Sequence, residues 1–154
     1  MPLPTKLTLE VVTPEGLLLR EEVDEVIAPG ELGYFGVLPG HTPFLSTLGA
    51  GEITYRRGSE KSHLTCFWGF SEVLPDRVNI LAEIGERAED IDVGRAEADK
   101  AGAEAALKAM IHDEEGYREA QERMKSVREE QGYEEAHQAY VRAVTRLAVA
   151  RQRR

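Results

Sequence analysis

The feature that most constrains the fold of this chain is a change in the spacing of its apolar residues near residue 90. Up to Glu89 apolar and polar residues alternate, as at Leu7, Leu9 and Val11. A period of two residues indicates strands with one buried face. Turn sequences such as TPEG, LPGHTP and RRGSEK separate these runs. Short strands that follow one another with no helical segment between them predict an antiparallel sandwich or barrel.

After Asp92 the apolar spacing lengthens to three and four residues, and residues 93–154 contain no proline. One apolar stripe consists of Tyr133, Ala136, Tyr140, Ala143, Leu147 and Ala150. This spacing predicts two long helices in a hairpin, with a break near Gly116 and the turn near Gly132. The stripe is rich in alanine, and because each buried methyl contributes only about 0.8 kcal/mol, we expect a weakly held hairpin. The sequence thus predicts two domains, at 1–89 and 90–154.

Composition excludes several classes of protein. The formal net charge of −9 argues against nucleic acid as a partner, because binding to phosphates needs clustered Lys and Arg. Cys66 is the only cysteine, so neither a disulfide within the chain nor a thiolate metal site is expected. The start of the chain lacks the apolar stretch of a signal peptide, and no apolar run approaches twenty residues. We therefore expect an intracellular protein that reaches a membrane only through other proteins.

The histidines form no catalytic or metal-binding group in the sequence. His112 stands before three acidic residues, but consecutive residues point around a helix and cannot converge on a metal. His41 lies in the segment 28–45, which is rich in glycine and proline and therefore suits either a catalytic loop or a docking edge. As a general base His41 would need a serine or cysteine held by a second partner, and no such motif is present. We expect no catalytic residue and interpret His41 as a structural or interface residue.

Positive charge is concentrated at the end of the chain, where residues 136–154 contain five arginines and no acid. Arg142 and Arg146 are four residues apart, one turn after Gln138, so they share a helix face. Two interpretations remain open. The arginines complement the helix dipole, or they form a basic stripe for an acidic partner or a phosphate.

Residues 27–56, IAPGELGYFGVLPGHTPFLSTLGAGEITYR, closely resemble the signature of the epsilon subunits of F-type ATP synthases, which are equivalent to delta in mitochondria. Residues 63–83 resemble the strands that follow in this family, with Trp68 and Gly69 in place of a glycine pair. The resemblance extends over nearly the whole chain. It implies a ten-stranded antiparallel β-sandwich followed by an α-helical hairpin, here unusually long because of an extra segment near 112–130.

The resemblance also implies a function. Residues 1–89 would dock on the gamma subunit and the c-ring, and residues 90–154 would be regulatory. The chain would be a non-catalytic rotor subunit that couples c-ring rotation to the alpha and beta subunits of the head through gamma. Its C-terminal helices would inhibit ATP hydrolysis, and the complex would hold it on the cytoplasmic side of the cell membrane. The alternative is a sandwich and coiled-coil module of another complex, which would not bind gamma.

The resemblance assigns roles to individual residues as well. Glu31, His41, Thr42 and Ser46 match the interface with gamma and the c-ring. The sequence IDVGRA at 91–96 matches a motif of members that bind ATP; its residues Ile91, Asp92, Arg95 and Ala96 would bind regulatory ATP together with Arg142 and Arg146. The two arginines would also form the inhibitory stripe, and no resident cofactor is implied. The alternative for Asp92 is a helix N-cap, with Arg95 simply solvated.

Overall fold

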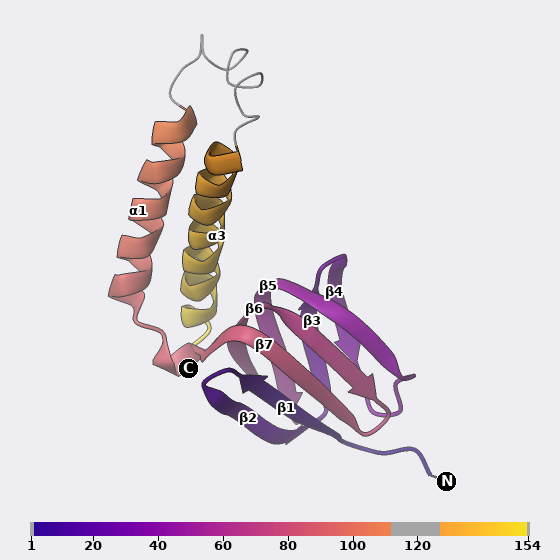
Figure 1. Ribbon diagram of the computed structural model, residues 1–154. Helices are drawn as coiled ribbons and strands as arrows, with labels where there is room; N and C mark the ends of the chain where they lie inside the picture. Colours follow the sequence, from indigo (N-terminus) through magenta and orange to yellow (C-terminus); the bar gives the residue numbers. More distant parts are fainter. Residues whose placement is uncertain (1, 112–126, 154) are drawn as a thin grey trace. The chain divides into compact units, whose positions relative to one another are not determined.

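The computed structural model describes residues 2–111 and 127–153 and contains a β-sheet and two helices (Figure 1). The strands are β1 (Leu7–Thr13), β2 (Gly16–Val23), β3 (Glu25–Gly30), β4 (Gly33–Val37), β5 (Phe44–Arg57), β6 (Glu60–Leu74) and β7 (Arg77–Arg87). A 3₁₀ turn at Ala88–Asp90 leads to the helices α1 (Val93–Ile111) and α3 (Val127–Ala150). The chain divides into two compact units, 1–91 with 148–154 and 92–147. The prediction of strands followed by helices is confirmed.

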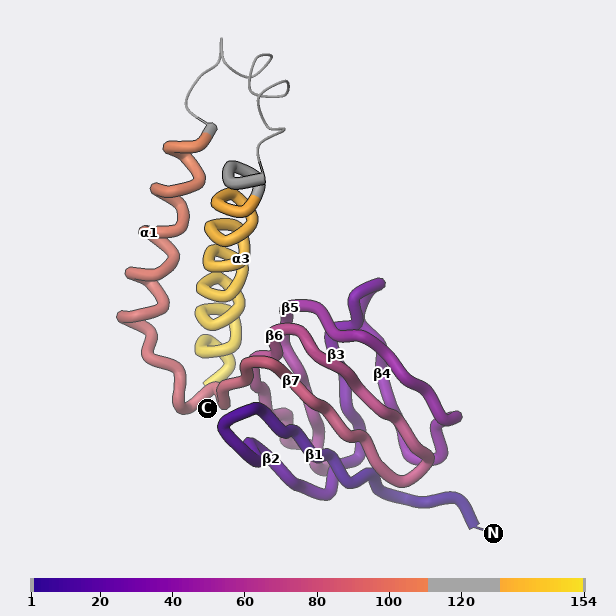
Figure 2. The backbone as a smooth tube through the Cα atoms, viewed as in Figure 1, coloured from indigo at the N-terminus to yellow at the C-terminus, as the bar shows by residue number. Residues whose placement is uncertain are grey.

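The sheet has seven strands in the described residues, in the order β2-β1-β7-β6-β5-β3-β4. It curves back on itself, as the backbone trace in Figure 2 shows. The prediction of ten strands is therefore wrong, because β5 and β6 run without interruption for 14 and 15 residues and pair along most of their length. The expectation of purely antiparallel pairing is also wrong, since β1 lies parallel to β7, with Leu9 opposite Val78.

The core fills the inner face of this curved sheet. Leu7, Leu9 and Val11 are fully buried, which confirms the predicted alternation in β1, and they join Val78 and Ile80 of β7 in one cluster. The same cluster includes Val26, Ala28, Val37, Ile53, Leu64 and Val73 from the other strands. Burial of a large aliphatic side chain contributes about 1.5–3 kcal/mol, so this face supplies most of the stability of the unit.

Strand β6 contains a left-handed backbone step at Trp68 and Gly69, whose φ angles are 57° and 122°. Gly69 pairs with Ala82 of β7, and a Cβ added at Gly69 would lie 1.9 Å from the carbonyl oxygen of Leu81. The left-handed region is unfavourable for bulky side chains, so this step favours glycine at both positions and Trp68 adopts it against its preference. Gly69 is required here for both its φ angle and its lack of a side chain.

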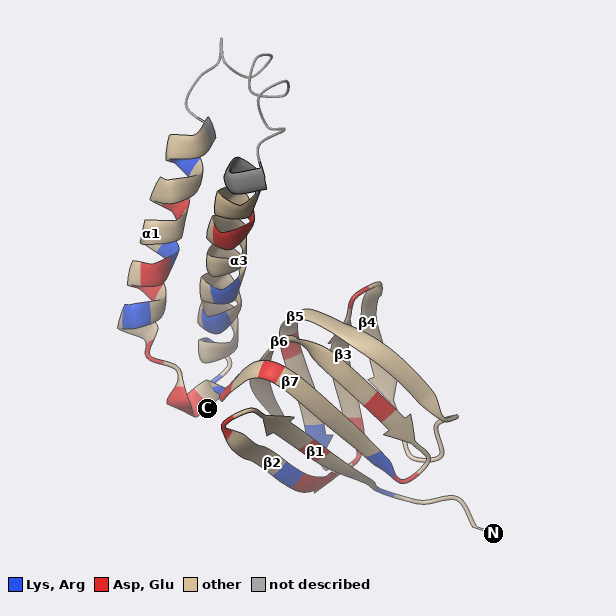
Figure 3. Ribbon diagram, in the orientation of Figure 1, with Lys and Arg blue, Asp and Glu red and all other residues tan. Residues whose placement is uncertain are grey.

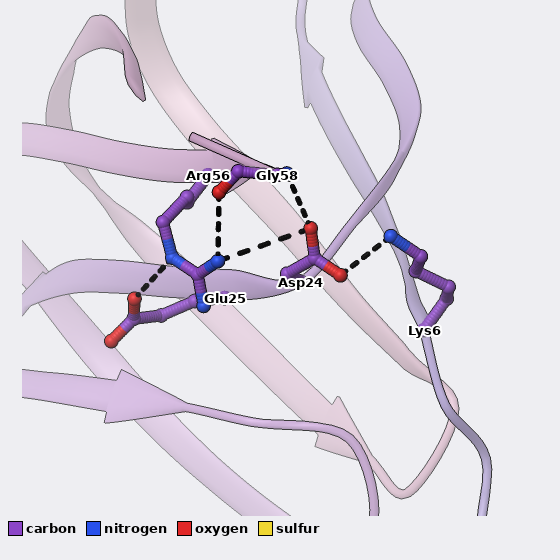
Figure 4. Close-up of polar contacts among 5 residues, drawn as sticks. All are labelled: Lys6, Asp24, Glu25, Arg56 and Gly58. Carbon is purple, nitrogen blue, oxygen red and sulfur yellow. Dashed lines mark hydrogen bonds and ion pairs between the residues drawn. The ribbon is translucent and has the colours of Figure 1, made fainter. Parts of the chain in front are cut away.

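A polar network around Asp24 ties together three segments of the sheet (Figure 4). Lys6 Nζ donates to Asp24 Oδ1 at 2.5 Å, and the Gly58 amide donates to Asp24 Oδ2 at 2.6 Å. Arg56 donates to Glu25 Oε2 at 3.1 Å and to the Gly58 carbonyl at 3.0 Å. Asp24 thus connects the residue before β1, the junction of β2 with β3, and the turn between β5 and β6. The hydrogen bond from Lys6, followed by that from Gly58, lowers the pKa of the Asp24 carboxyl below its ordinary value.

We expect Asp24→Asn to lower the free energy of unfolding at neutral pH. Because the folded-state pKa is depressed, the carboxylate contributes its full stability above its unfolded pKa of about 3.9, and the contribution is lost as pH falls through the folded-state pKa. The difference from the wild type should therefore narrow in acid. Urea denaturation at about pH 7 and about pH 3 measures this, with Glu15→Gln in an exposed turn as control. Equal unfolding free energies for the two variants at neutral pH would contradict this role for Asp24.

The helical unit is an antiparallel pair with small residues at its seam. Ala96 and Ala103 of α1 and Ala143 of α3 are buried, whereas Tyr133 of the predicted stripe is 43 % exposed. The predicted turn near Gly132 is wrong, because α3 begins at Val127 and continues through this residue. A single glycine costs a helix only about 1 kcal/mol, and a Cβ at Gly132 would lie 3.6 Å from Met110 Cε of α1.

Part of the predicted hairpin falls outside the described residues. The predicted break near Gly116, the group at His112 and most of the extra segment near 112–130 lie there. Within the described ranges, neither helix is long and apolar enough to cross a membrane.

Candidate functional site

The segment 28–45, rich in glycine and proline, forms the β3–β4 hairpin and the loop from β4 to β5. Gly30 and Gly33 pair at the hairpin end, and the φ of Gly33 is 131°. In the following loop the Gly40 amide donates to the Pro75 carbonyl at 2.7 Å, and the φ of Gly40 is 82°. The second contact fixes the 38–43 loop to the turn between β6 and β7.

The four predicted interface residues lie in the β3–β4 turn, in the 38–43 loop and at the start of β5. Glu31 is exposed at the hairpin end, and its carboxylate accepts a hydrogen bond from Thr47 Oγ1 at 2.7 Å. Ser46 is half-buried, and its hydroxyl donates to the Thr47 carbonyl at 2.9 Å. His41 and Thr42 lie in the loop, where Nδ1 of His41 is 2.7 Å from the Thr42 carbonyl oxygen. The structure therefore brings Glu31 and Ser46 together around Thr47.

His41 makes an aromatic contact as well. Its ring centroid is 6.3 Å from that of Phe44, which in turn contacts Phe35 edge-on at 5.4 Å. Because Nδ1 of His41 bonds to a main-chain carbonyl rather than to a nucleophile or a carboxylate, this geometry suits a positioned surface residue better than a general base.

An open groove of about 710 Å³, which the sequence reasoning missed, crosses the outer face of the sheet beside this loop. Its apolar part consists of Leu45, Phe70 and Leu81, which are 72, 55 and 59 % exposed. The other residues that line it are Thr8, Glu10, Arg20, Glu72, Asp76, Arg77 and Asn79. Exposed apolar patches bordered by polar residues mark interaction surfaces. The sequence pattern that could have predicted it is the presence of apolar residues at outward-facing positions of three strands, β5, β6 and β7.

Most polar groups that line the groove are paired with one another. Arg77 donates to both carboxylate oxygens of Asp76, at 3.0 and 2.9 Å, and this contact lowers the pKa of Asp76. Asn79 donates to Glu72 at 2.9 Å, and Arg20 lies 3.5 Å from Glu10. Because these groups already have partners, burial of the groove by another protein would be stabilised chiefly by contacts with Leu45, Phe70 and Leu81.

The motif at 91–96 has structural contacts of its own. Ile91 is buried with Ala88, Val149 and Ala150. The carboxylate of Asp92 accepts from the Arg95 amide at 3.0 Å, which confirms the interpretation of Asp92 as an N-cap. Ala96 is 1 % exposed, whereas Arg95 is exposed. Folding alone therefore accounts for the isoleucine, the aspartate and the alanine of this motif.

Arg142 and Arg146 lie one turn apart on α3 and are both half-buried. Arg146 Nη1 is 3.7 Å from Oδ2 of Asp99 on α1, a partner that sequence reasoning missed although Asp99 lies one turn beyond Arg95. In Figure 3 both helices carry acidic and basic residues, and the basic positions of α3 lie nearer its C-terminal end than the acidic ones. A carboxylate beside Arg146 competes with any phosphate for the guanidinium group.

The residues that the structure describes were also considered as metal ligands and as a reactive thiol. No group of three or more His, Cys, Asp or Glu residues that could hold a metal ion occurs among the described residues. Cys66 is fully buried, and burial raises the pKa of its thiol to about 12. A protonated buried thiol is a poor nucleophile and a poor metal ligand.

Comparison with known proteins gives one family. The model of the ATP synthase Delta/Epsilon chain beta-sandwich domain matches residues 6–88. The ATP synthase epsilon chain of Geobacter metallireducens is 49% identical over 113 residues, which cover 73% of this chain and 82% of the relative. The ATP synthase epsilon chain 2 of Syntrophotalea carbinolica is 50% identical over 116 residues, or 75% of this chain and 84% of the relative.

A solved structure extends the likeness in fold to both units. A chain in the Euglena gracilis mitochondrial ATP synthase structure, titled as OSCP/F1/c-ring in rotational state 1, matches with a TM-score of 0.74. It is 19% identical, and the match covers 96% of this chain and 83% of that chain. Sheet and helices thus follow the same architecture in the two chains.

Proposed function

The chain belongs to the ATP synthase delta/epsilon family, and from this membership we propose that it is the central-stalk rotor subunit of a proton-translocating F-type ATP synthase. It is a non-catalytic subunit. Its role is to couple rotation of the c-ring to the alpha and beta subunits of the catalytic head through gamma. The complex holds it at the cytoplasmic side of the membrane. The observation that carries this role is the exposed apolar groove beside the 38–43 loop.

We place gamma on the groove and on the adjoining loop residues His41, Thr42 and Ser46. Leu45 joins the two parts, because it follows Phe44 in the chain and lines the groove. The contact of Gly40 with Pro75 pre-organises the loop, so docking loses little conformational entropy. We place the c-ring at the hairpin end, where Glu31 is held by Thr47 and the next residue, Leu32, is fully exposed.

The helical unit is the inhibitory part in this proposal. Its seam is lined by Ala96, Ala103 and Ala143, whose methyl groups contribute only about 0.8 kcal/mol each, so the two helices separate at small cost. Once α3 is released, Arg142 and Arg146 meet acidic segments of the head and oppose rotation in the hydrolysis direction. This mode of action requires a release of α3, not a chemical step.

The proposal includes a regulatory ATP molecule bound by arginines of the helical unit. Arg142 and Arg146 would bind the phosphates together with Arg95 near the start of α1, and Asp99 would have to give up Arg146. A ligand shifts such an equilibrium only by its differential affinity for the two states. ATP therefore relieves inhibition only where it binds the paired helices more tightly than the separated ones.

Reconstitution tests the proposed function. The chain is expected to copurify with co-expressed gamma and to slow ATP hydrolysis by the head. The double variant Arg142→Ala/Arg146→Ala should still bind gamma but restore hydrolysis severalfold. Lys100→Ala/Lys108→Ala, which removes two positive charges from α1, is the matched control and should inhibit like the wild type.

Each measurement has an outcome that would contradict one part of the proposal. Failure to bind gamma would favour the alternative, a module of another complex. Equal hydrolysis rates with the wild type and the arginine variant would refute the inhibitory role alone. If calorimetric titration detects no heat of binding at millimolar ATP, the regulatory role of ATP is refuted and the rotor role is unaffected.

A further inference from the structure

The last turn of α3 belongs to the sheet unit although it follows the helical unit in the chain. Val149 is fully buried and Ala150 is 8 % exposed, and both pack with Ala88 and Ile91 in a small cluster separate from the main core. Ala88 is the first residue of the 3₁₀ turn that leads from β7 to α1, and Ile91 follows the turn. The end of α3 is therefore packed on the segment from which α1 starts.

A single arginine reinforces this contact. Arg153 Nε donates to the Ala88 carbonyl at 2.6 Å, and Arg153 Nη2 donates to the Ile91 carbonyl. A planar guanidinium can bind two acceptors at once, here the carbonyl of the first residue of the 3₁₀ turn and that of the residue after the turn. Two further turn contacts position the arginine, from the Gln152 amide to the Val149 carbonyl at 2.9 Å and from the Arg153 amide to the Ala150 carbonyl at 3.3 Å.

We propose that residues 149–153 form a terminal latch, a conformational device that holds the end of α3 on the segment 88–91. The latch joins the two chain ends of the helical unit, because residue 91 precedes its first residue and residue 148 follows its last. While the latch is closed, the end of α3 stays on residues 88–91. Release of α3 requires the burial of Val149 and both Arg153 hydrogen bonds to be lost together. The inference concerns the isolated chain and does not depend on the proposed role in ATP synthase.

Hydrogen–deuterium exchange on the full chain tests the latch. Arg153→Ala is expected to speed amide exchange in residues 88–92 and 148–152 by about tenfold or more, because two charge-assisted hydrogen bonds are lost. Arg153→Lys should give an intermediate increase, since an ammonium group lacks the planar fork. Arg151→Ala is the matched control, because Arg151 is exposed and the same charge is removed two residues earlier.

Two outcomes of the exchange experiment would refute the latch. If Arg153→Ala exchanges like Arg151→Ala in both segments, Arg153 does not hold the end of α3 and the latch is refuted. If exchange in β1 and β7 rises as much as in residues 148–152, the contacts stabilise the whole sheet unit, and a separate device is likewise refuted. Faster exchange confined to the two segments, with Val149→Ala giving the same pattern, would support it.

Discussion

Gly69→Ala is expected to unfold the sheet unit or to destabilise it by about 4 kcal/mol or more. An added Cβ would lie 1.9 Å from the Leu81 carbonyl oxygen and 2.9 Å from its carbonyl carbon, and both atoms are main chain. They belong to β7, which is paired on both sides, with β1 and β6, and cannot move aside. The φ of 122° at Gly69 adds backbone strain. Since a domain is stable by only about 5–15 kcal/mol, this change removes much of the total.

Two other glycines separate the steric part of this effect from the strain. Gly16 has a φ of 131° but nothing within 4 Å of an added Cβ, so Gly16→Ala should lose only about 1–3 kcal/mol through strain. Gly36 has neither a positive φ nor a close neighbour, so Gly36→Ala should be near neutral or stabilising by about 0.4–1 kcal/mol. Urea denaturation followed by circular dichroism ranks the three variants. A loss at Gly69 no larger than at Gly16 would mean that β7 yields to the new side chain.

The strand and helix content was predictable because it depends on local spacing. Leu7, Leu9 and Val11 alternate along the chain and face the same core. Ala143 and Ala150 lie seven residues apart and are both buried. The N-cap at Asp92 is equally local, since its partner is the amide three residues on. These features need no knowledge of which segments meet.

What the sequence could not predict depends on long-range pairing. Phe70 and Leu81 meet in the groove because the register of β6 and β7 places them opposite each other. The parallel pairing of β1 with β7 and the contact of Arg146 with Asp99 are long-range in the same way. The turn predicted at Gly132 is wrong for a related reason. The low helix propensity of glycine favours a turn at this position, but α1 lies beside Gly132 and α3 continues through it.

Phe70→Asp is expected to weaken binding to gamma by about a hundredfold, or about 2.7 kcal/mol, while leaving the sheet folded. Phe70 is 55 % exposed and lines the groove, so its replacement removes apolar contact area and buries a charge at a docked interface. The same exposure means that the free chain loses little, within about 0.5 kcal/mol. Calorimetric titration with gamma measures the affinity, and urea denaturation measures the stability.

Leu17→Asp is the matched control, because Leu17 is 60 % exposed on β2 and does not line the groove. It introduces the same charge at a similar exposure, so it should bind gamma like the wild type. The loop variant His41→Ala should weaken binding less than Phe70→Asp, since it leaves the apolar residues of the groove intact and His41 is only half-buried. If Leu17→Asp and Phe70→Asp bind gamma equally well while His41→Ala does not, gamma docks on the loop alone. The groove then needs another occupant, because Leu45, Phe70 and Leu81 would stay exposed in the assembled stalk.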